Sequence, residues 1–537
     1  MRLKLVRNVA VSPLWRSGNC TFPPLSTSIL TAYLKNKYHD IVQDDLHIKW
    51  YRLLTGHETE KLELLTQDQV KLWDYLQNAN DKEWDWYGDT VLTLTQFENF
   101  DIILISIHSS DPLCSMTALA LARYLKNKFN VTIILGGEYY AYPPIRYVID
   151  DVLKTRAIDY YISGFGEIPL DMLLNYLDGN KKNTDLKLIP GLCYLENSET
   201  RTNPYELFHE TVVPLFDGLP LKLYQWQPKT ELLKNKFITE NDRLVLPFQT
   251  STGCPFNCAF CESSSMNKVS IMPPQTVAKS LEYFKHQYHC HTFFFVDNSL
   301  NARPGYVEEL CDEIIKRRLN IQWMDSGCVK GMGKDTLLKM REAGCIRIVW
   351  GLESGSKRIL KFINKPTSLE NASKVFHLAN EAGIWNGVEI LVGMPTETDH
   401  EFDETLDFLK DHKDVLDEIW ANPYYLNAVS KMYLEPDRYG IQNIKRVNMG
   451  LTKEKGMNRA SVAEFDEKSG LKWHDKEKQI AQRLSSVNQL KFSLSLDPGF
   501  DLYDYAQHLL SWCYKNFNSK TEIRKAYREF ILKLKNG

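Results

Sequence analysis

Apolar and amphipathic segments alternate along the first part of the chain. Asp101–Ile107 and Val131–Gly137 are apolar almost throughout, which is typical of strands buried on both faces of a sheet. Between them, Ser115–Lys128 places its apolar residues on one face, as an amphipathic helix does. This repetition predicts an α/β class with a doubly wound, Rossmann-like parallel sheet. Further strands are expected at 3–11, 40–44 and 159–167.

The same alternation restarts at Arg243 and continues to residue 411. Five or six strand–helix units fit this stretch, fewer than the eight of a complete TIM barrel. The pattern therefore predicts a partial barrel. The expected strands are 243–249, 291–297, 321–326, 345–353 and 385–392, and the expected helices are 273–286, 306–317, 335–343, 370–382 and 401–411.

Changes in composition divide the chain into four segments. The first domain covers 1–205 and contains an apparently helical insertion at 51–100. A proline-interrupted connector at 206–242 leads to the barrel at 243–445. The remaining residues, 446–537, carry amphipathic helical patterns. We expect this helical C-terminal domain to cap the mouth of the barrel and to shape the substrate pocket.

Composition narrows the class of protein. The 537 residues are 43% hydrophobic and 25% charged, with a formal net charge of −3, so charge gives no reason to expect a nucleic-acid or membrane-surface partner. The N-terminal apolar run is too short for a signal peptide, and no run approaches the ~18 residues of a membrane span. Most of the 11 cysteines are scattered in apolar stretches, unlike a disulfide framework. A soluble, cytoplasmic protein is expected.

Cys254, Cys258 and Cys261 follow the first strand of the barrel. Three thiolates can bind three irons of a 4Fe–4S cube and leave the fourth iron open. Because four cysteines are usual for electron transfer, a three-cysteine loop suggests that the open iron binds another molecule. A structural zinc site is the alternative, but zinc requires four ligands and the nearest downstream candidates have no matching spacing.

This spacing, with Phe260 just before the third cysteine, resembles the radical S-adenosylmethionine (SAM) enzymes. In that family the amino and carboxylate groups of SAM chelate the open iron. The resemblance implies a 4Fe–4S cluster and SAM as cofactors, with the three cysteines as catalytic and metal-binding residues and Phe260 beside the cofactor. It also implies a partial (β/α)6 TIM-type barrel.

Polar or small residues end four further strands of the barrel, where catalytic residues of such folds collect. Each could instead be an ordinary turn with a capping Asp or Ser, but their order behind the cysteine loop matches the family. The resemblance implies contacts with the SAM amino group at the second strand, with ribose at the third and fourth, and with adenine at the fifth. In that order the residues are Asp297 and Asn298, Asp325 and Ser326, Glu353 and Ser354, and Gly393 and Pro395.

The first domain resembles the cobalamin-binding domain that precedes the barrel in one large radical SAM class. The resemblance rests on Phe22–Leu25, Ile105–Ser106, Leu135–Gly137 and Ser163–Glu167. Small residues at three neighbouring strand ends leave room for a large planar ligand. The implied cobalamin-binding residues are Pro24, Ser106, His108, Gly136, Gly137, Glu138, Gly164, Gly166 and Glu167.

One feature of other cobalamin domains is missing. The Asp-x-His-x-x-Gly motif that ligates cobalt is absent, because Asp45 and His47 follow the second strand and Trp50 stands at the glycine position. We interpret this partial match as a coincidence. The ligand below the cobalt remains open.

The combined resemblance implies transfer of a methyl group from SAM, via methylcobalamin, to an unactivated carbon or phosphorus of a small molecule or peptide. An electron donor such as flavodoxin or ferredoxin is expected, and neither a nucleic acid nor a membrane. A cobalamin-dependent cyclase or ring-rearranging enzyme is an alternative. A methylthiotransferase-like enzyme and a non-catalytic cobalamin-binding sensor are the others, and the intact cysteine loop argues against the sensor.

Overall fold

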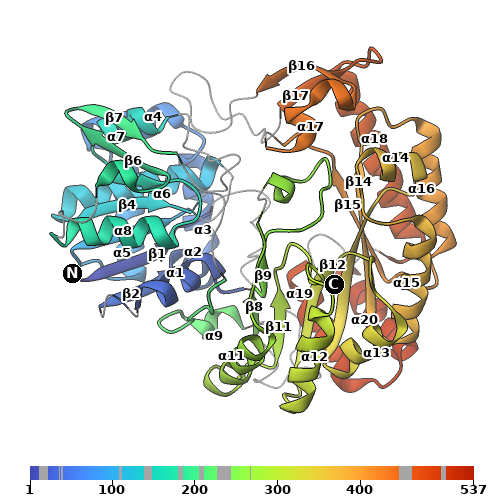
Figure 1. Cartoon of the computed structure of the whole chain (residues 1–537). Coiled ribbons are helices and arrows are strands. Elements are labelled where there is room, and N and C mark those ends of the chain that lie inside the picture. Colours follow the sequence, from blue (N-terminus) through green and yellow to red (C-terminus); the bar gives the residue numbers. More distant parts are fainter. Residues whose placement is uncertain are drawn as a thin grey trace. The chain divides into compact units, whose positions relative to one another are not determined.

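The computed structural model of the chain divides into two compact units, 1–224 with 447–462, and 225–446 with 463–537 (Figure 1). Two predicted cobalamin-binding residues, His108 and Glu138, lie outside the residues that the structure describes. Within those residues, no helix has the length and apolar character needed to cross a membrane. The described residues are 1–10, 22–35, 37, 40–107, 112–137, 148–179, 185–204, 211–225, 244–265, 268–427, 429–446, 463–496 and 503–536.

A seven-stranded sheet with the order β2-β1-β3-β4-β5-β6-β7 forms the centre of the first unit. Strands β1 to β5 are parallel, and a hairpin, β6–β7, adds two antiparallel strands at one edge. The doubly wound sheet predicted from the sequence is therefore confirmed. The strands are β1 (Leu3–Arg7), β2 (Ile41–Asp45), β3 (Ile102–Ser106), β4 (Thr132–Gly136), β5 (Tyr160–Ile162), β6 (Leu192–Glu196) and β7 (Glu199–Thr202).

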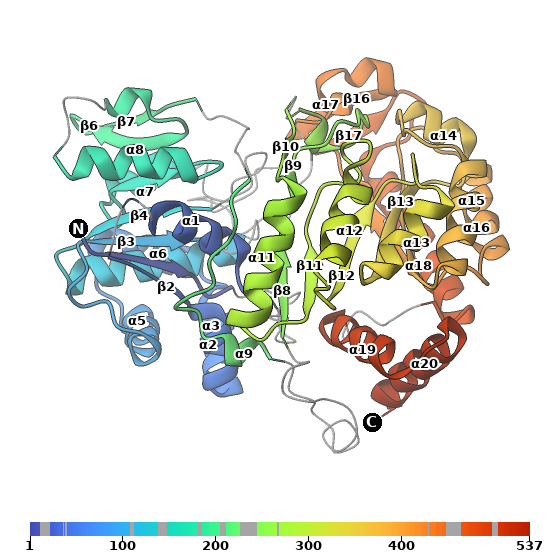
Figure 2. The same ribbon diagram turned by 60° about the horizontal axis from the view of Figure 1, so that its bottom comes forward.

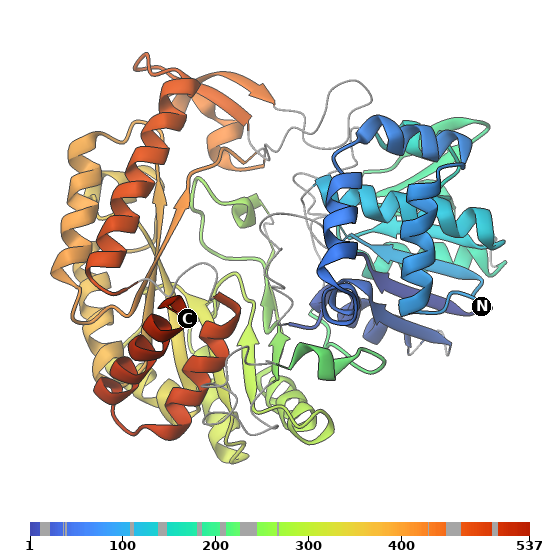
Figure 3. The ribbon, with the colours of Figure 1, turned by 180° about the vertical axis from the view of Figure 1, so that it is seen from behind.

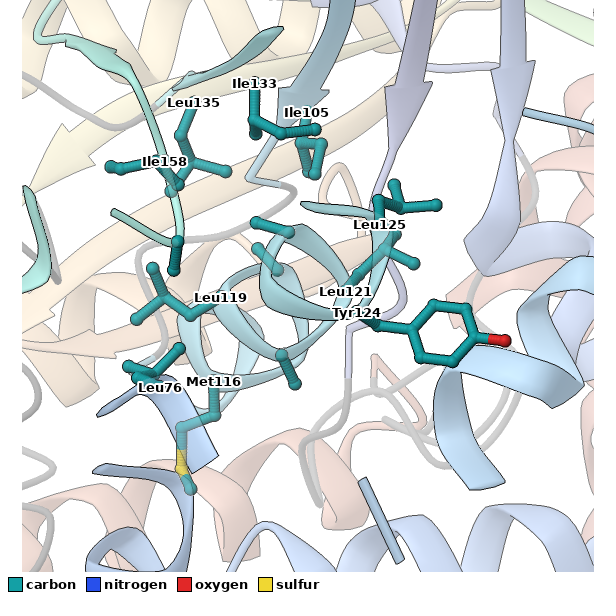
Figure 4. Close-up of a cluster of buried hydrophobic side chains, with 14 of the residues drawn as sticks. Leu76, Ile105, Met116, Leu119, Leu121, Tyr124, Leu125, Ile133, Leu135 and Ile158 are labelled. Carbon is teal, nitrogen blue, oxygen red and sulfur yellow. The ribbon is translucent and has the colours of Figure 1, made fainter. Parts of the chain in front are cut away.

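Side chains of the central strands alternate between two apolar layers. Ile103 and Ile105 of β3 join the layer under α6 (Pro112–Lys128), which Figure 4 shows in close-up. Ile102 and Leu104 join the opposite layer, against α1 (Leu25–Lys35) and α8 (Glu167–Leu177). Because both faces are covered, Ile102–Ile105 of β3 are apolar at every position, and not only at every second one.

Four helices occupy the chain between β2 and β3 and share one apolar cluster with α6. Trp50, Trp84 and Tyr87 of this group are fully buried. At Gly88 a Cβ atom would lie 2.2 Å from the ring of Tyr124, so the glycine permits close approach of the last of these helices to α6. These helices therefore extend the core of the first unit. They are α2 (Leu46–Leu53), α3 (Gly56–Leu65), α4 (Gln69–Asn78) and α5 (Lys82–Leu94).

Six parallel strands form the second unit, in the order β15-β14-β13-β12-β11-β8. Each new strand is added on the same side of the last, as in a TIM barrel and unlike the first sheet, so the (β/α)6 prediction is confirmed. The strands are β8 (Val245–Phe248), β11 (Thr292–Phe295), β12 (Gln322–Gly327), β13 (Cys345–Glu353), β14 (Trp385–Val392) and β15 (Glu418–Pro423). The helices between them are α11 (Pro274–Gln287), α12 (Tyr306–Lys316), α13 (Lys334–Glu342), α14 (Lys357–Phe362), α15 (Leu369–Glu381) and α16 (Asp399–Asp411).

The C-terminal segment is largely helical, as predicted from the sequence, but it also contains one strand that was not predicted. β17 (Ala463–Glu467) pairs antiparallel with β16 (Ile441–Arg446). Alternate residues of β17, Ala463, Phe465 and Glu467, are buried, so the segment has the period of a strand. Before the pair lies the short helix α17 (Lys431–Leu434), and after it comes α18 (Trp473–Ser493).

The last two helices lie at the end of the barrel opposite to the predicted one (Figures 2 and 3). In α19 (Tyr503–Asn516), the hydroxyl of Ser511 lies 3.0 Å from that of Thr292 and donates to Gln322 (2.6 Å), at the beginnings of β11 and β12. In α20 (Lys520–Asn536), Lys520 pairs with Asp417 (2.9 Å), just before β15. The two helices thus close the amino ends of the strands. The mouth of the barrel is formed by the carboxyl ends of the strands, so the expectation that these helices cap the mouth is wrong.

Candidate functional site

The loop that carries the three cysteines starts directly after the first barrel strand. Short strands β9 (Ser251–Thr252) and β10 (Ser270–Ile271) pair antiparallel at its base. Gly253 enters the loop with a φ of +79°, and a Cβ atom there would lie 2.2 Å from the carbonyl oxygen of Lys268. The entry to the loop therefore requires glycine.

Hydrogen bonds from two other segments hold the middle of the loop. The N–H of Ala259 donates to the carbonyl of Ile363 (2.8 Å), and the carbonyl of Ala259 accepts from the N–H of Met432 (3.1 Å). The side chain of Asn364 donates to the carbonyl of Asn257 (2.8 Å). The barrel itself therefore sets the conformation of the loop.

Cys254, Cys258 and Cys261 are buried or half-buried and form no disulfide. Burial raises the pKa of all three thiols, that of Cys258 to about 12. Such thiols ionise when a cation compensates the charge, and thiolates are the ligands of iron–sulfur clusters. Among the described residues, no three His, Cys, Asp or Glu side chains lie close enough together to hold a single metal ion. Three thiols are one ligand short of the four that a structural zinc ion requires, so the donor set fits a cluster with one open iron better. Phe260 packs on an apolar cluster of the barrel.

Asn298, just beyond β11, connects the two ends of the cysteine loop. Its side-chain oxygen accepts from the N–H of Gly253 (3.1 Å), the residue before Cys254. Its amide nitrogen donates to the hydroxyl of Ser263 (2.9 Å), two residues after Cys261. One side chain therefore fixes the span of the loop.

Asp297 and Asp325 are buried carboxyl groups at the ends of β11 and β12. Asp297 accepts from the N–H groups of Thr250 and Ser251, each at 2.8 Å. Asp325 accepts from the N–H of Ser326 (2.7 Å), while its Oδ2 has no hydrogen-bond partner in the described part of the protein. Burial raises the pKa of Asp297 to about 6, and burial with the charge of Asp297 raises the pKa of Asp325 well above its usual value. The two groups therefore resist ionising together.

The turn after β13 holds a buried ion pair. Glu353 has a φ of +70°, and its carboxylate lies 2.7 Å from the ammonium of Lys365, with side-chain exposures of 7% and 10%. Burial alone would lower the pKa of Lys365, but the charge and hydrogen bond of Glu353, together with Cys258 and Cys328, raise that pKa. The hydroxyl of Ser354 accepts from the N–H of Ser356 (3.1 Å) and closes the turn. The sequence alone did not indicate a role for Lys365, because a lysine before Pro366 is expected to be exposed.

The turn after β14 contains Gly393 and Pro395. Gly393 has a φ of +92°, and its N–H donates to the carboxylate of Glu397 (3.3 Å). A Cβ atom at Gly393 would lie 2.3 Å from Ile480 of α18. Helix α18 therefore packs directly on the predicted adenine-binding turn.

Two buried cations of α18 hold the same turn. Lys476 donates to the carbonyl of Met394 (2.8 Å), and Arg483 pairs with Glu397 (2.7 Å). The sequence places Ile480, Leu484 and Val487 on one apolar face, and the structure buries Ile480 and Val487 of these, together with Lys476 and Arg483. Charged residues in an amphipathic helix are usually solvated, so the pattern alone did not reveal them.

The sequence pattern also did not single out Glu389 of β14 as a candidate site residue. Its carboxylate accepts from Asn422 of β15 at 2.6 Å, and burial, with the nearby charge of Glu353, raises its pKa to about 7. A glutamate inside the otherwise apolar run Val388–Val392 is the signal that could have indicated it.

In the first unit, Ser106, Gly136 and Gly137 come together at the carboxyl ends of β3 and β4. Ser106 and Gly136 are register partners. Gly137 has a φ of +99°, and a Cβ atom there would lie 2.7 Å from the Ser106 hydroxyl oxygen. Because β2 and β3 flank β1 on opposite sides, the sheet reverses its winding beside these residues, where open α/β sheets bind ligands.

Pro24, Gly164, Gly166 and Glu167 lie at the starts of α1 and α8. Gly164 has a φ of +88°, and Glu167 is the first residue of α8 and is buried. A Cβ atom at Gly166 would lie 3.2 Å from Leu30 of α1. The two helices therefore approach closely, and these residues gather on one face of the sheet.

The Asp45 and His47 side chains have internal partners. Asp45 accepts from Arg7 of β1 (2.9 Å), and His47 accepts from the N–H of Ala10 (3.0 Å). His47 is fully buried. Both side chains thus secure the packing of β1 against α2.

Comparison with known sequences gives a family and relatives. Residues 248–409 match the profile of the Radical SAM superfamily. An uncharacterized methyltransferase of Pyrococcus horikoshii is 26% identical over 333 residues, which cover 60% of this chain and 67% of the relative. The anaerobic magnesium-protoporphyrin IX monomethyl ester cyclase of Rubrivivax gelatinosus is 26% identical over 52% of this chain and 49% of its own length. The chain thus spans about half of the cyclase.

Among solved structures, the chain is similar to the radical S-adenosylmethionine methyltransferase TsrM from Kitasatospora setae, solved with cobalamin and a [4Fe-4S] cluster bound. The TM-score is 0.61 at 15% identity, and the match covers 99% of this chain and 98% of that one. At this identity the likeness establishes the fold.

Proposed function

We propose that this chain, whose residues 248–409 form a radical SAM domain, is a cobalamin-dependent radical SAM methyltransferase. The observation that carries the proposal is the cysteine loop. Its three thiols are the donor set of a cluster with one open iron, and Asn298 fastens the loop at both ends. The doubly wound sheet ahead of the barrel supports a second, planar cofactor.

The side chains of this protein would bind and orient the reactants. Cys254, Cys258 and Cys261 would hold a 4Fe–4S cluster, and the Glu353 carboxylate would accept hydrogen bonds from the ribose hydroxyls of SAM. The Gly393–Pro395 turn, held by α18, would receive the adenine. When bound, the cluster would supply the electron and cobalamin would carry the methyl group, which protein side chains cannot do.

The acceptor would be an unactivated carbon or phosphorus of a small molecule or peptide, since an acceptor that a base can activate does not need radical chemistry. An electron donor such as flavodoxin or ferredoxin would reduce the cluster. We expect the cytoplasm, because an oxygen-sensitive cluster requires a reducing compartment.

Cyclisation is a second candidate, favoured by the aligned ester cyclase of Rubrivivax gelatinosus. The two outcomes differ in product mass. A methyltransferase adds a labelled methyl group from SAM to its product, whereas an oxidative cyclase removes hydrogen and adds no label.

Anaerobic reconstitution with iron, sulfide and hydroxocobalamin tests the proposal. We expect stoichiometric bound corrinoid after gel filtration, visible in the absorbance spectrum, and 5′-deoxyadenosine formation from SAM after reduction. A chain that binds the cluster but no corrinoid would contradict the cobalamin assignment and leave the barrel assignment intact.

Cys258→Ala should abolish 5′-deoxyadenosine formation. Cys311, buried in α12 away from the loop, provides the matched control, and Cys311→Ala should retain the activity. Full activity of Cys258→Ala would refute the assignment of the loop.

A further inference from the structure

Lys365 is held in fixed relation to the cysteine loop. It lies between α14 and α15, and its N–H donates to the carbonyl of Leu360 (2.9 Å). The two preceding residues bond to the loop on either side of Cys258, Ile363 through Ala259 and Asn364 through Asn257. The backbone at Lys365 is therefore held beside the loop.

The ammonium of Lys365 is buried at the barrel mouth. It pairs with Glu353 at 2.7 Å, and a Cβ atom at Gly351 would lie 2.8 Å from its nitrogen. Gly351 thus leaves the space that the ammonium occupies. Any larger residue at this end of β13 would displace the lysine.

The charge of Lys365 reaches several groups besides Glu353. Electrostatic interaction connects it with the thiols of Cys254 and Cys258, and with Glu389. At low effective dielectric, a buried charge acts over such separations far more strongly than an exposed one.

Lys330 offers a natural contrast. It is exposed, and its ammonium lies 6.0 Å from the ring centre of Phe256 in the same cysteine loop. Solvent and salt screen its charge. Lys365 and Lys330 therefore carry the same formal charge near the loop, one buried and the other exposed.

We propose that Lys365 is a positioning residue that raises the reduction potential of the cluster and holds Glu353 for the ribose of SAM. This inference rests on the proposed function, since it requires the cluster. A one-electron reduction adds negative charge to a site that already carries three thiolates. A buried cation stabilises that reduced state, and net charge and burial are among the properties that set cluster potentials.

The two partners of the lysine give opposite predictions. Without Lys365, Glu353 becomes an uncompensated buried anion beside the cluster, so the potential should fall. Without the Glu353 charge, the ammonium is unopposed, so the potential should rise. In the double variant Lys365→Met with Glu353→Gln both charges disappear, and the potential should lie between those of the single variants.

The test is the midpoint potential of the reconstituted cluster, measured by an EPR-monitored redox titration without SAM. We expect Lys365→Met to make reduction at least about tenfold less favourable, about 59 mV for one electron. Lys330→Met should leave the potential unchanged, and Lys365→Arg should keep it near that of the wild type.

The outcomes separate this inference from the function. A wild-type chain that takes up no iron would contradict the proposed function. A cluster whose potential is equal in the wild type, Lys365→Met and Glu353→Gln would overturn the role of Lys365 alone. If Lys365→Met fails to hold a cluster, Glu353→Gln provides the test, since that variant keeps the lysine. A cluster potential higher than that of the wild type would support the role of Lys365, and an unchanged potential would overturn it.

Discussion

Arg483 of α18 donates from Nη1 to Oε2 of Glu397, in the turn after β14, at 2.7 Å, with both side chains buried. The same turn contains Gly393, which contacts α18 directly. A helix that lies outside the profile-matched domain thus fixes the proposed adenine-binding turn. If the turn binds adenine as proposed, the C-terminal segment therefore supports the binding of SAM.

Arg483→Met should destabilise the protein by about 3–5 kcal/mol, because it leaves Glu397 buried without its partner. SAM affinity should fall as well, since the turn loses its anchor. Chemical denaturation measures the first effect, and isothermal titration calorimetry measures the second.

Arg438→Met is the matched control. Its partner Glu435 is exposed, so we expect a loss below about 1 kcal/mol and unchanged SAM binding. Equal losses in the Arg483 and Arg438 variants would show that burial of the first pair has no energetic consequence.

Gly393→Ala combines a left-handed backbone with a collision against Ile480. Gly383 has a φ of +80°, but a Cβ atom there meets nothing nearer than 3.9 Å, so Gly383→Ala isolates the backbone cost. We expect about 1–2 kcal/mol for Gly383→Ala and about 1–3 kcal/mol more for Gly393→Ala. Indistinguishable denaturation midpoints would argue against close packing of α18 on the turn.

The carboxyl pair Asp297 and Asp325 should make stability depend on pH. Their pKa values are raised in the folded protein, to about 6 for Asp297, so the native state holds protons that the unfolded state has released. The unfolding free energy of the apo-protein should therefore decline as pH rises from about 4 to 6.

Asp325→Asn removes one of the two charges, so the decline should become smaller and stability at pH 7 should increase. Asp312→Asn, which changes an exposed carboxylate, should keep the wild-type dependence. Urea denaturation at several pH values provides the comparison, and identical slopes for Asp325→Asn and the wild type would contradict it.

Asn298→Ala should lower iron incorporation severalfold, because each end of the cysteine loop loses a hydrogen bond worth about 1 kcal/mol. Circular dichroism should remain unchanged. Asn516→Ala, on the exposed surface of α19, is the control. Normal iron content in Asn298→Ala would show that the loop does not need the hydrogen bonds of Asn298 to bind a cluster.

Local patterns made much of the fold predictable. Ile102–Ile105 and Ile133–Leu135 are apolar at every position because both faces of the sheet are covered. The order of the cysteine loop and the strand-end turns indicated the barrel. Such features depend on residues close together in the sequence.

The unpredicted features depend on distant partners. Lys365 and Arg483 read as solvated charges until the fold supplies Glu353 and Glu397. The position of α19 depends on Ser511 meeting the beginnings of two strands far away in the sequence. No periodicity in a helix specifies which end of a barrel it covers.

The iron and acid-labile sulfide content after anaerobic reconstitution tests the central assignment most directly. About four of each per chain are expected for the wild type, and a marked loss for Cys258→Ala, since a 4Fe–4S cluster would lose one of its three thiolates. A wild-type chain that holds one zinc ion and no iron would contradict the assignment of Cys254, Cys258 and Cys261 as cluster ligands.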